Sequence, residues 1–150
     1  MKKTAYLLLL SIFFISCSKN IEPIAYGEES CDFCMMTIVD QSHAAQLVTQ
    51  KGKNYKFDAT ECMINYLEQH NNEKEMLHIL SADYTNPGNM IEVTEATFLI
   101  SENIPSPMGE FLSAVKEKDQ AEELQKEYEG ELFDWSSVKQ QISKHSNVKN

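Results

Sequence analysis

The chain has 150 residues, of which 42% are hydrophobic, and this is enough for the core of one ordinary domain or of two very small ones. The formal net charge is −10, every basic residue is lysine, and no basic patch alternates with aromatic residues, which argues against nucleic-acid binding. The chain also lacks a nucleophile motif and a phosphate-binding glycine loop, so a binding protein is favoured over an enzyme.

The N-terminal segment predicts an exported lipoprotein. Two lysines precede the apolar run Ala5–Ile15, which has the length of a signal peptide and is too short to cross a bilayer as a helix. The run ends in Phe14-Ile15-Ser16-Cys17, which resembles a bacterial lipobox with Phe14 in place of the usual leucine. We expect residues 1–16 to be removed and Cys17 to be lipidated, which would anchor the protein to a membrane surface. Ordinary signal cleavage, which leaves Cys17 as a free thiol, is the alternative.

The first half of the exported chain predicts a tether, a small sheet and one helix. Residues 17–30 are mostly polar and predict a flexible tether. Asp58 and Glu61 have the spacing of a capping box, and the apolar positions that follow predict a helix to His70, with Cys62 in its first two turns. Strands are expected at residues 36–39 and 44–49, which would form a hairpin, and at 55–57 and 76–82.

The second half repeats this order of elements. The turn at Thr85–Asn89 is the best internal boundary, Asp119 predicts the cap of a second helix, and Gly130 predicts its end. The sequence thus predicts one α+β domain over residues 31–145, with sub-units at about 31–84 and 90–145. Further strands are expected at residues 90–94, 97–101 and 131–135, residues 111–115 form a short apolar run, and a short helix is expected at 136–144.

Sulfur-bearing residues dominate the candidate site. The stretch Cys31-Asp32-Phe33-Cys34-Met35-Met36 holds two thiols and two thioethers within six residues, and Cys62-Met63 is a second sulfur pair. Soft sulfur donors select Cu(I) over hard divalent ions. Met108 follows a proline at a break in the chain, where exposure is favoured, whereas Met63 shares a helical face with Leu67 and fits core packing better than ligation. The predicted metal ligands are Cys31, Cys34, Met36, Cys62, Met63 and Met108.

Other meanings of the Cys31–Cys34 pair stay open. One is a thiol-disulfide oxidoreductase, although in that class the pair opens a helix after a strand. A structural zinc site would need four Cys or His ligands, and beyond the pair only Cys62 and four scattered histidines are available, of which His43 is the first to test. The remaining alternatives are a disulfide between Cys31 and Cys34 and a surface lipoprotein whose sulfur residues are only structural.

Short motifs follow one another along the chain in a fixed order and spacing. They are Cys31-x-x-Cys34-x-Met36-x-Ile38, Ala44-Ala45-Gln46, Phe57-Asp58 followed by Cys62-Met63 and Tyr66-Leu67, Asp83-Tyr84, Pro107-Met108-Gly109, Ala121-Glu122-Glu123, Gly130 and Asp134-Trp135. In this order they resemble the NosL family, lipid-anchored accessory proteins of nitrous oxide reductase, from about residue 29 to residue 138. Two positions depart from the family pattern: Met35 replaces a glycine, and Ala59 replaces the second acid after Phe57.

The resemblance implies a function and a fold. It implies a monomeric Cu(I) chaperone anchored outside the cytoplasmic membrane, facing the periplasm, that takes copper from an ABC-type membrane transporter complex. The copper would be delivered for assembly of the copper-sulfur centre of nitrous oxide reductase. The resemblance also implies two small β-β-α-β units similar to those of organomercurial lyase. We expect a reversible site at Cys62 and Met108 with the Cys31–Met36 segment beside it, as one shared site or as two.

Overall fold

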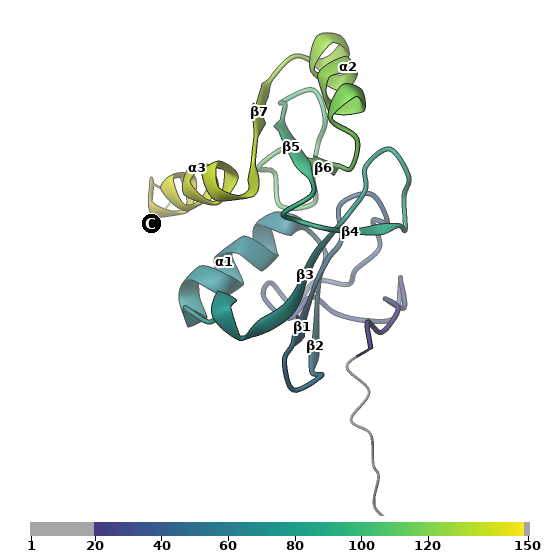
Figure 1. Cartoon of the computed structure of the whole chain (residues 1–150), viewed down its shortest axis with the longest axis vertical. Helices are drawn as coiled ribbons and strands as arrows, with labels where there is room; N and C mark the ends of the chain where they lie inside the picture. Colours follow the sequence, from purple (N-terminus) through teal and green to yellow (C-terminus); the bar gives the residue numbers. More distant parts are fainter. Residues whose placement is uncertain (1–19, 149–150) are drawn as a thin grey trace, which may run out of the picture.

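A computed structural model of the chain describes residues 20–148, so the predicted signal peptide and Cys17 lie outside the described residues. Within that range, no helix combines the length and the apolar character needed to cross a membrane. The described chain forms two small units, each with one antiparallel sheet and one helix, and a C-terminal helix that returns to the first unit (Figure 1).

The first unit has β-β-α-β order and a four-stranded sheet in the order β2-β1-β3-β4, with every neighbouring pair antiparallel. The strand β4 follows the predicted internal boundary in the sequence but completes the first sheet. The elements are β1 (Ala45–Thr49), β2 (Asn54–Phe57), α1 (Thr60–His70), the short 3-10 helix η1 (Glu73–Glu75), β3 (Met76–Ala82) and β4 (Met90–Glu92).

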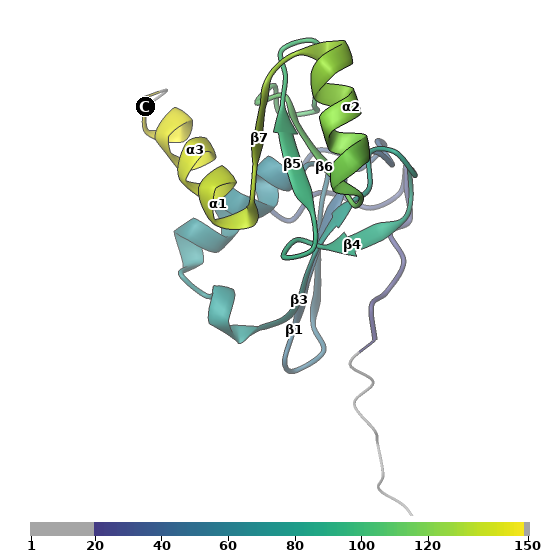
Figure 2. The same ribbon diagram turned by 45° about the horizontal axis from the view of Figure 1, so that its top comes forward.

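The second unit repeats the β-β-α-β order on a smaller, three-stranded sheet in the order β6-β5-β7. The orders β2-β1-β3 and β6-β5-β7 place equivalent strands in equivalent positions, which confirms the predicted α+β class with two units in tandem. Figure 2 shows the second unit at the top of the view, above the sheet of the first unit. The elements are β5 (Thr97–Ile100), β6 (Leu112–Val115), α2 (Lys118–Tyr128), β7 (Glu131–Phe133) and α3 (Trp135–Val148).

A single buried cluster joins the two units. Helix α1 contributes Met63 and Leu67, which recur at helical spacing on its buried face. Sheet residues such as Phe57 and Phe98 and the α3 residue Ile142 belong to the same cluster, and burial of this apolar surface is the main term that holds the units together.

Residues 20–30 lie against the sheet of the first unit, which differs from the flexible tether that the sequence predicts. Ile24 is buried, and the buried Lys56 ammonium donates to the Pro23 carbonyl at 2.9 Å and to the Glu29 carboxylate at 2.6 Å. Gln46 Nε2 donates to the Glu22 carbonyl at 2.8 Å. The face of the sheet opposite α1 is therefore covered by the segment before β1.

The hairpin predicted for residues 36–39 and 44–49 is wrong. Residues 36–39 make only an isolated bridge between Thr37 and Ser30, and the first hairpin of the structure is β1 with β2. Ile38 is buried in the core cluster while Val39 is exposed, so the apolar pattern of 36–39 does not reflect a strand.

The predicted helix caps are also wrong. Helix α1 starts after Ala59 with no side-chain cap, because Asp58 and Glu61 make other contacts described below. Helix α2 begins at Lys118, one residue before the predicted cap, and Asp119 lies in its first turn, where its charge still favours the helix dipole. The end of α2 is well predicted, since Gly130 has φ +106° and a Cβ atom there would collide with the Ile100 carbonyl oxygen.

Candidate metal centre

Three cysteine thiols and one carboxylate converge beside the start of α1. The Sγ atoms of Cys31, Cys34 and Cys62 and a carboxylate oxygen of Asp58 all lie within 4.8 Å of one another. All three cysteines are free thiols, so the predicted alternative of a Cys31–Cys34 disulfide does not describe this structure. The cluster unites two motifs that are far apart in the sequence.

A tight loop fixes Cys31 and Cys34. The Cys31 N–H donates to the Met36 carbonyl at 2.8 Å, and the Met35 N–H donates to the Cys31 carbonyl at 3.0 Å. The neighbouring Asp32 exchanges two hydrogen bonds with the backbone of Lys56 in β2, at 2.8 and 2.7 Å. The loop is thereby attached to the strand that leads to Asp58.

The other half of the cluster comes from the passage between β2 and α1. Asp58 follows the last residue of β2, and Cys62 lies in the first turn of α1. Asp58 Oδ1 accepts a hydrogen bond from Cys34 Sγ at 3.4 Å. Asp58 Oδ2 is buried and has no hydrogen-bond partner among the described residues, and a buried unpaired oxygen is unfavourable unless a proton or a ligand meets it.

Cys31 is prepared to be a thiolate. A hydrogen bond from the Cys62 thiol lowers the pKa of Cys31 to about 6, helped by the backbone N–H groups of Cys34, Asp58 and Phe33 and opposed by burial. Cys31 has no exposed surface, so its negative charge is held by fixed donors with no contact to bulk water. A buried thiolate of this kind is ready to bind a cation.

The other two thiols keep their protons. The hydrogen bond to Cys31 raises the pKa of Cys62, and burial adds to the effect. Burial raises the pKa of Cys34 to about 11, with a further contribution from the nearby Cys31. At neutral pH the apoprotein site therefore carries one thiolate and two thiols, and a bound cation would displace protons from the latter.

The structure brings the predicted thiols together, but the predicted thioethers differ in their burial. Met63 has no exposed surface and belongs to the hydrophobic core. Met36 is 51% exposed and the neighbouring Met35 is 73% exposed, beside the half-buried Cys34. Met108 is partly buried and packs against the same core cluster that contains Cys31 and Cys62. Whether any thioether binds a metal stays a prediction.

A buried carboxyl group connects Cys62 with the loop that carries Met108. Glu61 has no exposed surface, and its Oε1 accepts from Ser106 Oγ at 2.5 Å and from the Leu112 N–H at 3.4 Å. Ser106 Oγ in turn accepts from the Phe111 N–H at 2.9 Å, which closes the loop around Met108. Burial raises the pKa of Glu61 to about 7. The second unit thus reaches the metal centre through one residue of α1.

The three histidines whose side chains the structure describes make other contacts. His43 Nδ1 lies 2.8 Å from Asp40 Oδ2, and its Nε2 lies 3.3 Å from Ser113 Oγ in β6, so both ring nitrogens have partners away from the thiols. His78 contacts Glu92, and His70 contacts the Tyr66 carbonyl. Within residues 20–148, the cluster of potential metal ligands contains no histidine.

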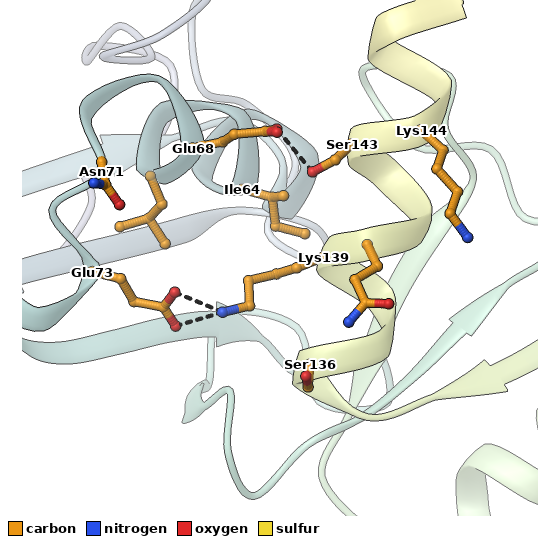
Figure 3. Close-up of a pocket in the computed structure, with 10 residues that line it drawn as sticks. Ile64, Glu68, Asn71, Glu73, Ser136, Lys139, Ser143 and Lys144 are labelled. Atoms are coloured by element: carbon orange, nitrogen blue, oxygen red, sulfur yellow. Dashed lines mark hydrogen bonds and ion pairs between the residues drawn. The ribbon is translucent and has the colours of Figure 1, made fainter.

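A groove of about 550 Å³ between α1 and α3 is separate from the thiols (Figure 3). Its walls are joined by the ion pair between Lys139 and Glu73, at 2.6 Å, and by the hydrogen bond from Ser143 to Glu68, at 2.8 Å. No cysteine or methionine of the described chain lines this groove. The groove is therefore distinct from the cluster of potential metal ligands at the start of α1.

Asp58 is the site residue that the sequence reasoning missed. We expected it to cap α1, but its carboxylate faces Cys34. The available signal was its position directly before the helix that carries Cys62, at the end of a buried strand. The resulting set of three sulfur atoms and one oxygen, with one sulfur already ionised, can hold a thiophilic cation.

The fold is that of a known class of structure. The chain matches the crystal structure of the copper chaperone NosL from Shewanella denitrificans with a TM-score of 0.68 and 20% sequence identity, over 79% of this chain and 94% of that chain. Fold and cluster together define a two-unit α+β protein with a thiol-rich centre. A family model, NosL, matches residues 24–143, and the chain belongs to the NosL family. This confirms the resemblance seen in the motifs. A comparison with curated protein sequences finds no match.

The ionisation of Cys31 can be measured directly. In the reduced apoprotein we expect the ultraviolet absorbance of one thiolate to appear with an apparent pKa of about 6, because donors around Cys31 favour its charged form. Cys31→Ser should abolish this step, and Cys34→Ser should leave it in place. Ionisation of all three thiols only in the ordinary range, near 9, would contradict the proposed donor arrangement.

The buried Glu61 should make the apoprotein less stable as the pH rises. Its pKa is about 7 in the folded chain against an ordinary value of 4.5, so between these values the folded chain holds a proton that the unfolded chain has lost. Glu61→Gln should match the wild type below pH 4.5 and be more stable above pH 7, by on the order of 3 kcal/mol. Denaturant unfolding at both pH values measures the difference. Equal stability of both proteins at high pH would show that Glu61 ionises freely.

Proposed function

We propose that the protein binds Cu(I) at the cluster of Cys31, Cys34 and Cys62 and hands it to a partner protein. The observation that supports this most is the convergence of three free thiols, one of them stabilised as a thiolate, within 4.8 Å. Membership of the NosL family agrees with it, because the Shewanella denitrificans protein of the same fold is a copper chaperone.

The donor set favours a monovalent soft ion. Thiolate and thioether sulfur select Cu(I), which needs only two or three donors. Cys31 and Cys62 are fully buried with their sulfur atoms within 4.8 Å, so an ion between them would displace the proton of Cys62. Cys34 is only half buried and completes the set from the outer side.

The same geometry supports release of the ion. Two exposed thioethers, Met35 and Met36, follow Cys34 directly and provide weak donors at the surface. In a low-coordinate Cu(I) site an incoming donor can bind before an existing donor leaves. A partner with its own thiol or thioether ligands would therefore reach the ion from the Cys34 side, while Cys31 and Cys62 release it last.

The site is best placed in an exported, membrane-anchored protein. The signal-like run and Cys17 support export and lipid anchoring, with the domain facing the periplasm. We infer an ABC-type membrane transporter complex as the copper source and the copper-sulfur centre of nitrous oxide reductase as the destination, because the motif resemblance described above implies both.

Structural zinc is a second candidate that one observation favours. The four donors of Cys31, Cys34, Cys62 and Asp58 match the number of ligands that zinc takes in closed sites. Asp58 had no place in the zinc alternative considered from the sequence, so the structure makes this alternative stronger. An experiment must therefore determine whether the site binds Zn(II) or Cu(I).

The structure does not favour the thiol-disulfide alternative. In that class the low-pKa cysteine must be reached by an external disulfide. Here the low-pKa residue, Cys31, has no exposed surface, and the accessible Cys34 has a raised pKa. The pair also lies in a loop and not at the start of a helix.

Titration of the reduced protein with Cu(I), against a competing chelator, should give a single tight site. Cys62→Ala should weaken binding by more than about 10-fold because it removes a buried sulfur donor. Met108→Ala should weaken it if the loop held by Glu61 supplies a thioether. Met76→Ala is the matched control, since Met76 is a partly buried core residue outside the cluster and should bind as the wild type does.

Two results would reject the assignment. Unchanged Cu(I) affinity in both Cys62→Ala and Met108→Ala would place the copper elsewhere. A site that retains Zn(II) when an equal concentration of Cu(I) is present would favour the structural zinc candidate.

A further inference from the structure

Three exposed lysines gather at one end of the first unit. Lys51, Lys53 and Lys74 line a hollow of about 420 Å³ formed by the β1–β2 turn and η1. Glu75 is the one acidic residue among its lining residues, and in the described part of the chain none of the three lysines forms an ion pair with a carboxylate. Without residues 1–16, which hold two lysines and no acid, the formal charge of the chain moves from −10 to −12. A surface lined by three lysines and one acidic residue is therefore unusual in a chain with such a large negative net charge.

The start of the described chain is bound at the same end. The side chain of Asn54, the first residue of β2, donates to the Asn20 carbonyl at 3.1 Å and accepts from the Glu22 N–H at 3.2 Å. Asn54 directly follows Lys53 in the sequence. Figures 1 and 2 both show the dark purple start of the described chain beside the β1–β2 turn.

This contact limits how far the domain can lie from Cys17. The step from Cys17 to Asn20 is three residues, which span at most about 11 Å even when fully extended. The fixed position of residues 20–30 removes the longer reach that a flexible tether would give. If Cys17 carries the lipid, the end that bears the lysines must lie close to the membrane surface.

We propose that the face formed by Lys51, Lys53 and Lys74 docks on the anionic headgroups of the membrane that holds the lipid anchor. This rests on the anchoring part of the proposed function and not on copper binding. Lysines without a carboxylate partner are attracted to an anionic bilayer within about one Debye length, roughly 10 Å, which is the range that the short link to Cys17 enforces. Two exposed apolar residues flank this end of the first unit. Ile21 follows Asn20 in the sequence, and Leu77 follows Met76, which pairs with Thr49 across the sheet.

Docking in this orientation presents the metal centre away from the lipid. Asn54 begins β2, and Asp58 follows its other end. The two residues are four positions apart, which is about 13 Å along an extended strand. Cys34 and the exposed Met35 and Met36 would then face the periplasmic space, accessible to a partner protein, instead of being covered by headgroups.

The test uses the full chain, purified from membranes with its lipid and reconstituted into vesicles of equimolar phosphatidylglycerol and phosphatidylcholine. An amine-reactive reagent labels exposed lysines, and mass spectrometry reads each site in vesicles and in neutral detergent. Labelling of Lys51, Lys53 and Lys74 should fall several-fold in the vesicles. The exposed Lys116, Lys118 and Lys126 of the second unit are controls within the same molecule and should be labelled equally in both. The protection should weaken at high salt.

A matched pair of variants strengthens the test. On vesicles, the docked face should protect residues 50–53 from amide hydrogen exchange. Replacing Lys51, Lys53 and Lys74 by glutamine should remove this protection. The same replacement of Lys116, Lys118 and Lys126 should not, although the change in charge is the same. The proposed orientation would be overturned if Lys51, Lys53 and Lys74 were labelled as strongly in vesicles as in detergent. It would also be overturned if the mass of Cys17 showed no lipid. Cu(I) binding measured on the same samples separates the two claims, because a wild-type protein that shows no protection on vesicles but binds Cu(I) normally overturns only the docking proposal.

Discussion

The close approach of the Cys31 and Cys62 sulfur atoms is the contact on which the rest of the site depends. It joins a loop that precedes the sheet to the first turn of α1, and it lowers the pKa of Cys31 while it raises the pKa of Cys62. The charge on Cys31 is held by backbone N–H groups of Phe33, Cys34 and Asp58, which are fixed donors in surroundings of low dielectric. The fold therefore holds the three thiols and the Asp58 carboxylate together, with Cys31 favoured as a thiolate.

The β-β-α-β unit explains how this contact is maintained. A strand end and a helix start bring Asp58 and Cys62 to one point, and the bonds of Asp32 to β2 hold the cysteine loop over it. The second unit has the same order of elements, and it reaches the cluster through Ser106 and the Leu112 backbone, which bind Glu61. The repeated unit occurs twice, with the thiol cluster on one copy and a supporting loop on the other.

The sequence predicts the parts of this arrangement that have a local signal. Alternating and helical patterns place β3, α1 and α2 nearly correctly, and the predicted thiols come from the two stretches that the structure brings together. The errors concern residues whose partners are distant in the sequence. Asp58 and Glu61 have the spacing of a cap, but Cys34 and Ser106 compete for their carboxylates, and no local pattern reveals that competition. The polar residues before Cys31 read as a tether because the cross-chain partners that hold them, among them Asn54, lie in a later strand.

The coordination of copper tests the central claim most directly. X-ray absorption at the copper edge of the reduced, copper-loaded protein should show Cu(I) with a first shell of two or three sulfur atoms. One of these should be lost in Cys62→Ser, because a hydroxyl is a poor donor for a soft ion. A first shell made only of nitrogen and oxygen, or one unchanged by that substitution, would contradict the account.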